Sequence, residues 1–144
     1  MTDPASAPQR RRLIVVDDDP VVRSMLNMLL SSDFELVGVA ADSVEGIELA
    51  KTSQPDAALV DIEMPRGGGI HAVRGISRVA PETAVVILSV DGSETTLSDL
   101  RHAGATACCR KGIAPRALAD SLVSSIEMRA HQRHGSSDTH GAMA

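Results

Sequence analysis

The sequence contains almost no aromatic residues. Phe34 is the only one among 144 residues, and tryptophan and tyrosine are absent. The core must therefore be built from aliphatic side chains and methionine, and the 43% hydrophobic content is enough for one packed domain. Such aliphatic composition is typical of a parallel sheet that is covered by helices on both faces.

Cysteines, long apolar runs and clustered basic residues are also scarce. Cys108 and Cys109 are adjacent in an expected strand, so they point to opposite faces, which excludes a CxxC redox or zinc pair and favours buried thiols. No apolar run approaches the roughly 18 residues of a membrane span, and the N-terminus lacks the apolar core of a signal peptide. The net charge of −5, with no basic stripe beyond residues 10–12, argues against direct nucleic-acid binding. We therefore expect a cytoplasmic protein without a membrane segment.

The chain is expected to form one domain, at residues 11–130, between two flexible tails. Residues 1–10 are rich in Pro, Ala and Ser, and residues 131–144 are rich in Gly, Ser and His without apolar periodicity. Within the domain, short runs rich in β-branched residues alternate with segments of helical spacing. The predicted strands cover residues 13–16, 35–40, 57–60, 84–88 and 106–109.

Helix signals lie between these strands. Asp19 and Pro20 suit an N-cap and a first helical position, and Asp42 and Glu45 have the spacing of a capping box. Further helices are expected after a glycine loop at residues 67–69, from residues 91–93 and from Pro115. The first helix is expected to turn these apolar residues toward the core: Val22, Met25, Leu26 and Leu29. Right-handed crossovers then predict an α/β fold, a flavodoxin-like (βα)5 doubly wound parallel sheet with strand order 2-1-3-4-5.

Polar residues follow four of the five predicted strands: Asp17 and Asp18, Asp61, Ser89, and Lys111. Because parallel strands end at the same edge of a sheet, these side chains should converge there. Three carboxylates repel one another unless a cation joins them, and a hard divalent ion suits oxygen ligands. Mg²⁺ fits best, since it keeps several waters and takes a few carboxylates plus a phosphoryl oxygen, whereas Ca²⁺ needs more protein oxygens.

This set of residues suits phosphoryl transfer. Mg²⁺ and the Lys111 ammonium group can neutralise an incoming phosphoryl group while Asp61 attacks phosphorus and Ser89 donates a hydrogen bond. Taken alone, Asp61 could be a turn residue, Ser89 a strand-end cap and Lys111 a solvated lysine. Their joint placement at strand ends favours a site.

Four fragments in register, VVDDDP, VDIEMP, VILSV and CRKG, resemble the receiver domain of two-component response regulators over residues 11–129. The resemblance implies that Asp61 accepts a phosphoryl group from a histidine kinase or phosphotransfer protein. It further implies that Asp18, Asp61 and the backbone carbonyl of Glu63 ligate Mg²⁺ directly, and that Asp17 acts through water. The protein would be a signalling switch that catalyses only its own phosphorylation and dephosphorylation.

By the same resemblance, Ser89 is the switch hydroxyl, and Lys111 followed by glycine is similar to the lysine motif of NarL-type receivers. Phosphorylation would draw Ser89 inward and change the surface of the fourth helix, fifth strand and fifth helix. Glu63 and Asp91 would flank the site and tune attacking water. The response would pass to a downstream protein or an output domain outside this segment, and homodimer formation is left open.

Three departures from the family pattern affect this expectation. Cys108 stands where an aromatic residue is usual, so coupling of Ser89 movement to an aromatic flip cannot operate as in the family. Val90 replaces a small residue and should narrow access to the site. Glycine replaces an acidic residue in the loop at residues 67–69, which should loosen that loop.

Two alternatives stay open. Asp17, Asp19 and Val21 fit the DxDx[TV] pattern of haloacid-dehalogenase-like phosphohydrolases, with Asp17 as nucleophile and Asp19 as general acid. That interpretation leaves Asp61 unexplained, and no acidic pair follows Lys111 to complete its metal site. The other alternative is a pseudo-receiver, a protein-binding module that works without phosphorylation.

Overall fold

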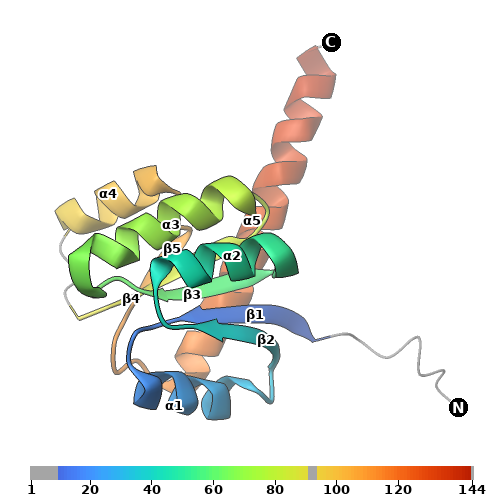
Figure 1. Cartoon of the computed structure of the whole chain (residues 1–144). Helices are drawn as coiled ribbons and strands as arrows, with labels where there is room; N and C mark the ends of the chain where they lie inside the picture. Colours follow the sequence, from blue (N-terminus) through green and yellow to red (C-terminus); the bar gives the residue numbers. More distant parts are fainter. Residues whose placement is uncertain (1–9, 91–93, 144) are drawn as a thin grey trace, which may run out of the picture.

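The computed structural model describes residues 10–90 and 94–143, which form a parallel five-stranded sheet with helices on both faces (Figure 1). The strand order is β2-β1-β3-β4-β5, which confirms the predicted topology. The strands are β1 (Arg11–Val16), β2 (Phe34–Ala40), β3 (Ala57–Asp61), β4 (Ala84–Ser89) and β5 (Ala107–Arg110). The helices are α1 (Pro20–Leu30), α2 (Ser43–Ser53), α3 (Gly68–Val79), α4 (Glu94–Ala103) and α5 (Pro115–Met143), with a 3-10 turn, η2 (Pro65–Gly67), before α3.

The first two helices begin at the predicted caps. The Asp19 carboxylate accepts a hydrogen bond from the Val21 amide at 2.8 Å, immediately after the end of β1. At α2, the Asp42 carboxylate accepts from the Glu45 amide at 2.8 Å, and the Glu45 carboxylate accepts from the Ala41 amide at 3.3 Å. Each helix therefore starts with backbone donors satisfied by side chains.

Alternation along the strands divides the core into two layers. Leu13 and Val15 of β1 pack with α1 and α5 on one face of the sheet, whereas Ile14 and Val16 pack with α2, α3 and α4 on the other. All four are fully buried, as expected for a central strand of a parallel sheet. The adjacent cysteines obey the same alternation, because Cys109 belongs to the first layer and Cys108, only half-buried, lies against the second.

Helix α1 turns only part of the predicted stripe toward the core. Leu26 is buried and Val22 packs against the core, as predicted. Leu30 is also buried, but Met25 and Leu29 are 48% and 39% exposed. The inward stripe follows every fourth residue, which leaves the two predicted positions on the flank of the helix. Helical spacing alone cannot fix this rotation, since several neighbouring stripes of α1 are apolar.

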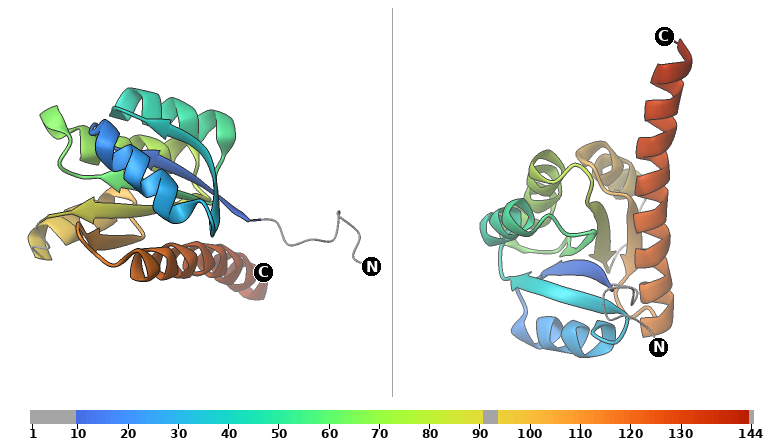
Figure 2. Two further views of the ribbon diagram at one scale, coloured as in Figure 1. Left: turned by 90° about the horizontal axis from the view of Figure 1, so that it is seen from below. Right: turned by 90° about the vertical axis from the view of Figure 1, so that its right-hand side faces the viewer.

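The structure also differs from the expected C-terminal tail, because α5 continues to Met143. Its C-terminal part stands clear of the domain (Figure 2). The absence of apolar periodicity after residue 130 does not prevent an already nucleated helix from continuing. In the described residues, no helix is both long and apolar enough to cross a membrane.

The glycine segment is more tightly placed than the predicted loose loop. Helix α3 already begins at Gly68, and a Cβ atom on Gly69 would overlap the carbonyl oxygen of Ile62. This close approach holds the start of α3 against the segment that follows β3. The predicted helix start at residues 91–93 and the tail at residues 1–9 lie outside the described residues.

Candidate functional site

The site lies where β1 and β3 end side by side. Val16 pairs with Val60, so the next residues along the two strands, Asp17 and Asp61, are neighbours. The Asp17 amide donates to the carbonyl of Ala40 at 3.0 Å, which continues the ladder one residue past β1. Sheet register thus places two carboxylates from distant parts of the sequence at one edge.

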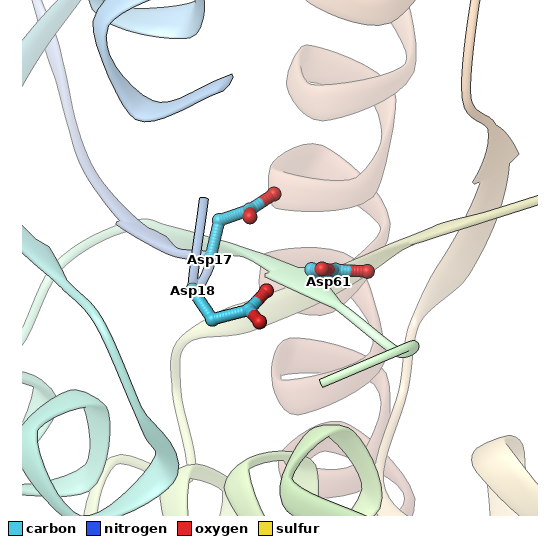
Figure 3. A group of neighbouring side chains, drawn as sticks. All are labelled: Asp17, Asp18 and Asp61. Carbon is cyan, nitrogen blue, oxygen red and sulfur yellow. The ribbon is translucent and has the colours of Figure 1, made fainter. Parts of the chain in front are cut away.

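Three carboxyl groups gather at this edge. Ligand oxygens of Asp17, Asp18 and Asp61 all lie within 4.8 Å of one another, and Figure 3 shows them around a common space. Asp17 and Asp61 are only 2% and 3% exposed, whereas Asp18 is exposed. Two buried carboxylates and one exposed carboxylate suit a hard divalent cation that keeps some of its water ligands. This is the arrangement predicted for Mg²⁺.

Burial raises the pKa of the Asp17 carboxyl, and the nearby Asp61 and Asp18 carboxylates raise it further. The Asp19 amide, which donates to Asp17 Oδ1 at 2.9 Å, and the Lys111 ammonium oppose this shift without cancelling it. The charged form of Asp17 is therefore disfavoured in the metal-free protein. A cation at this edge would remove that penalty.

Lys111 reaches the same edge from the end of β5. Its Nζ atom lies 2.8 Å from Asp61 Oδ1 and 3.4 Å from Glu63 Oε2. Its amide donates to the Ser89 carbonyl at 2.9 Å, which fixes the ends of β4 and β5 relative to each other. Burial lowers the pKa of the Lys111 ammonium, but the bond to Asp61 and the charge of Glu63 outweigh burial and raise it. The lysine is therefore cationic at neutral pH.

Burial also raises the pKa of the Asp61 carboxyl, against the opposing effects of the Lys111 ammonium and the Glu63 amide. That amide donates to Asp61 Oδ1 at 2.9 Å. The same oxygen of Asp61 is thus held by a lysine and a backbone amide. This arrangement orients the carboxylate in the pocket.

The Glu63 side chain connects the site to β4. Its Oε1 atom accepts from the Ser89 hydroxyl at 3.3 Å and from the Val90 amide at 2.5 Å. Partial burial raises the pKa of the Glu63 carboxyl, but the Val90 amide, Asp61 and Lys111 outweigh burial and lower it. Glu63 is therefore a carboxylate at neutral pH, held by groups from both β4 and β5.

The structure brings together the predicted site residues at one sheet edge: Asp17, Asp18, Asp61, Glu63, Ser89 and Lys111. Ligation of Mg²⁺ by the backbone carbonyl of Glu63 stays a prediction, and Asp91 lies outside the described residues. The sequence reasoning did not anticipate the contacts of the Glu63 side chain. The sequence feature that could have predicted these contacts is a second acidic residue, two positions after Asp61, at the same sheet edge as Lys111.

We expect the substitution Asp17→Asn to stabilise the metal-free protein. The raised pKa means that the folded protein loses stability as pH rises through the window between the unfolded and folded pKa values of Asp17. The full penalty is present above the folded pKa, so the neutral amide should raise the free energy of unfolding by about 1 kcal/mol at pH 7. Urea unfolding followed by circular dichroism, with a chelator present, measures this difference.

The exposed Asp99→Asn on α4 is the matched control for the loss of one negative charge, and it should change little. The difference in free energy of unfolding between Asp17→Asn and wild type should shrink below the unfolded pKa of Asp17, where this carboxyl is protonated in both the folded and the unfolded wild type. The difference should change sign when Mg²⁺ is added. A variant that is less stable than wild type in chelator at pH 7 would contradict the assigned cause.

The chain is similar to known proteins of one family. The family model described as response regulator receiver domain matches residues 13–123. The transcriptional regulatory protein PdtaR of Mycobacterium tuberculosis is 34% identical over 130 residues, which cover 88% of this chain and 60% of that protein. The chain thus spans about three fifths of the length of this curated relative.

Solved structures show the same fold. The response regulator domain of Thermotoga maritima CheB is 31% identical with a TM-score of 0.70, and the match covers 84% of this chain and 96% of that one. A two-component response regulator of the LuxR family from Aurantimonas is 26% identical with a TM-score of 0.78, over 84% of this chain and 88% of that one.

Proposed function

This chain belongs to the response regulator receiver domain family of two-component signalling systems, and from that premise we propose that Asp61 accepts a phosphoryl group from a histidine kinase or phosphotransfer protein. The observation that carries the proposal is the buried Asp61 carboxylate, held by Lys111 at 2.8 Å beside the Asp17 and Asp18 carboxylates. A nucleophile, a fixed cation and a set of oxygen ligands therefore share one pocket.

In the proposed reaction, an Asp61 oxygen attacks phosphorus and the P–N bond to the donor histidine breaks. The electron pair remains on the imidazole nitrogen, which takes up a proton. Lys111 pairs with one phosphoryl oxygen, and the Ser89 hydroxyl donates a hydrogen bond to another. Asp18, Asp61 and the Glu63 carbonyl would hold Mg²⁺ directly and Asp17 through water, and the ion would neutralise charge on the phosphoryl oxygens.

We place the output surface on α4, β5 and α5: α4 and β5 lie between Ser89 and Lys111 in the chain, and α5 follows Lys111. Phosphorylation would draw Ser89 toward Asp61 and alter this surface, which would then bind a downstream protein or an output domain outside this segment. The protein would act in the cytoplasm as a switch. Because Cys108 stands where an aromatic residue is usual, the conformational change that follows phosphorylation would have to spread through the backbone and through aliphatic packing.

The test is the intact mass of the protein after incubation with Mg²⁺ and acetyl phosphate. We expect one phosphoryl group on the wild type, none on Asp61→Asn, none in the presence of a chelator, and normal labelling of the control Asp99→Asn. In this assay the P–O bond to acetate breaks and acetate leaves with the electron pair.

Two other outcomes would contradict the proposal. An adduct that survives Asp61→Asn but is lost in Asp17→Asn, with continuous consumption of the donor, would favour the phosphohydrolase alternative. Its proposed general acid, Asp19, has its carboxylate engaged as the cap of α1. A wild type without any adduct would favour a phosphorylation-independent protein-binding module.

A further inference from the structure

The Glu63 carboxylate contacts the donors that a phosphoryl group on Asp61 would need. Its Oε1 atom accepts from the Ser89 hydroxyl at 3.3 Å and from the Val90 amide at 2.5 Å, and its Oε2 atom lies 3.4 Å from Lys111 Nζ. These donors come from the adjacent ends of β4 and β5. A single side chain therefore spans the side of the pocket that faces the hydroxyl and the ammonium group.

We propose that the Glu63 carboxylate closes the phosphoryl site in the resting protein and must swing out before Asp61 is phosphorylated. This inference rests on the proposed role of Asp61 as phosphoacceptor. It makes Glu63 a gating residue that sets how readily the domain is phosphorylated. Glu63 is not a catalytic residue, because its side chain leaves the pocket before phosphorus arrives.

Electrostatics explains why both groups cannot occupy the pocket. Lys111 already bridges two carboxylates, at 2.8 Å from Asp61 and 3.4 Å from Glu63. A phosphoryl group is anionic and would bind the same donors, which are the Lys111 ammonium, the Ser89 hydroxyl and the Val90 amide. The Glu63 carboxylate already takes the Ser89 hydroxyl and the Val90 amide, and a phosphoryl group would add negative charge beside it, so a phosphoryl group can bind these donors only after the Glu63 carboxylate has left them.

The structure allows this displacement without rearrangement of the backbone. The Glu63 side chain is 37% exposed, whereas that of Asp61 is only 4% exposed, so Glu63 can turn into solvent. The Glu63 amide remains bonded to Asp61 Oδ1 at 2.9 Å, and this bond does not depend on the side-chain rotamer. A rotation about side-chain bonds therefore opens the pocket while the nucleophile stays oriented.

Two substitutions separate the gate from a general charge effect. Glu63→Ala removes the carboxylate, whereas Glu63→Asp keeps the charge on a side chain one methylene shorter, which cannot span the same donors. Since the gate consists of charge-assisted hydrogen bonds, we expect Glu63→Ala to be labelled by acetyl phosphate about tenfold faster than wild type. Glu63→Asp should approach the rate of Glu63→Ala, and the exposed Glu48→Ala on α2 should match wild type.

Calorimetry of beryllofluoride binding in the presence of Mg²⁺ provides a second measurement. It does not depend on the rate of Asp61 dephosphorylation. We expect the affinity of Glu63→Ala for this phosphoryl analogue to rise about tenfold, with no change in Glu48→Ala.

Equal labelling rates and equal beryllofluoride affinities for wild type and Glu63→Ala would overturn the gate while leaving the phosphoacceptor assignment intact. A Glu63→Asp variant that behaves like wild type would also overturn it, because charge alone would then account for the effect. Failure of wild type and every variant to take a phosphoryl group would instead contradict the proposed function.

Discussion

Replacing Lys111 by methionine is expected to slow phosphorylation of Asp61 by about 100- to 1,000-fold, the usual cost of removing one preorganised charge-stabilising group. Methionine keeps the length of the side chain but removes the ammonium group that lies 2.8 Å from Asp61 Oδ1. The phosphoryl oxygens then lose their only fixed cationic side chain among the contacts described for this pocket. Intact mass, followed over time with acetyl phosphate and Mg²⁺, measures the rate.

The sequence offers a matched control, since Lys51 is the only other lysine. Lys51 is exposed in the last turn of α2, so Lys51→Met should be phosphorylated at the wild-type rate. Lys111→Met also removes a group that lowers the pKa of Asp61, so the variant should be compared with wild type by circular dichroism to verify folding. A folded Lys111→Met with wild-type kinetics would show that the ammonium is dispensable.

Gly69→Ala is expected to have the largest effect on stability, lowering the free energy of unfolding by about 3 kcal/mol. The added Cβ would overlap the Ile62 carbonyl oxygen and lie 2.5 Å from the Ile62 Cα atom. Because both obstacles are backbone atoms, α3 must move away from the segment after β3. Chemical unfolding followed by circular dichroism gives the stability.

The neighbouring Gly68→Ala is the control. Gly68 has helical dihedral angles, φ −61° and ψ −32°, and its added Cβ would meet the Met64 side chain at 3.3 Å. We expect a change within about 0.5 kcal/mol, since the helix-forming preference of alanine offsets this contact. If Gly69→Ala were as stable as Gly68→Ala, the close approach at Ile62 would be relieved more easily than the packing indicates.

Much of the fold followed from features that are local in the sequence. Short apolar strands, capped helices and the handedness of crossovers are enough to predict the strand order, because few other arrangements bury both faces of such a sheet. Placement of the polar residues followed from the same logic. Asp17, Asp61, Ser89 and Lys111 each end or follow a parallel strand, and such ends must share an edge.

The remainder depends on contacts that spacing does not encode. The direction of the Glu63 side chain is set by donors on Ser89, Val90 and Lys111, which come from two other strands. The rotation of α1, which exposes Met25, depends on how the helix packs against its neighbours. The length of α5 could not be predicted from apolar periodicity, because periodicity reports packing and not helix continuation.

The position of β1 has a consequence for the order in which the protein can be assembled. This strand pairs with β2, the next strand in the chain, but its other edge must wait for β3, where Leu13 lies opposite Ala57. During synthesis on the ribosome, β1 therefore has an unpaired apolar edge until the third strand emerges, which makes the nascent chain prone to misassociation. The same pairing creates the acidic pocket. A metal ion that needs both Asp17 and Asp61 can stabilise only chains in which these strands have met, so it would act late in folding and favour the completed sheet.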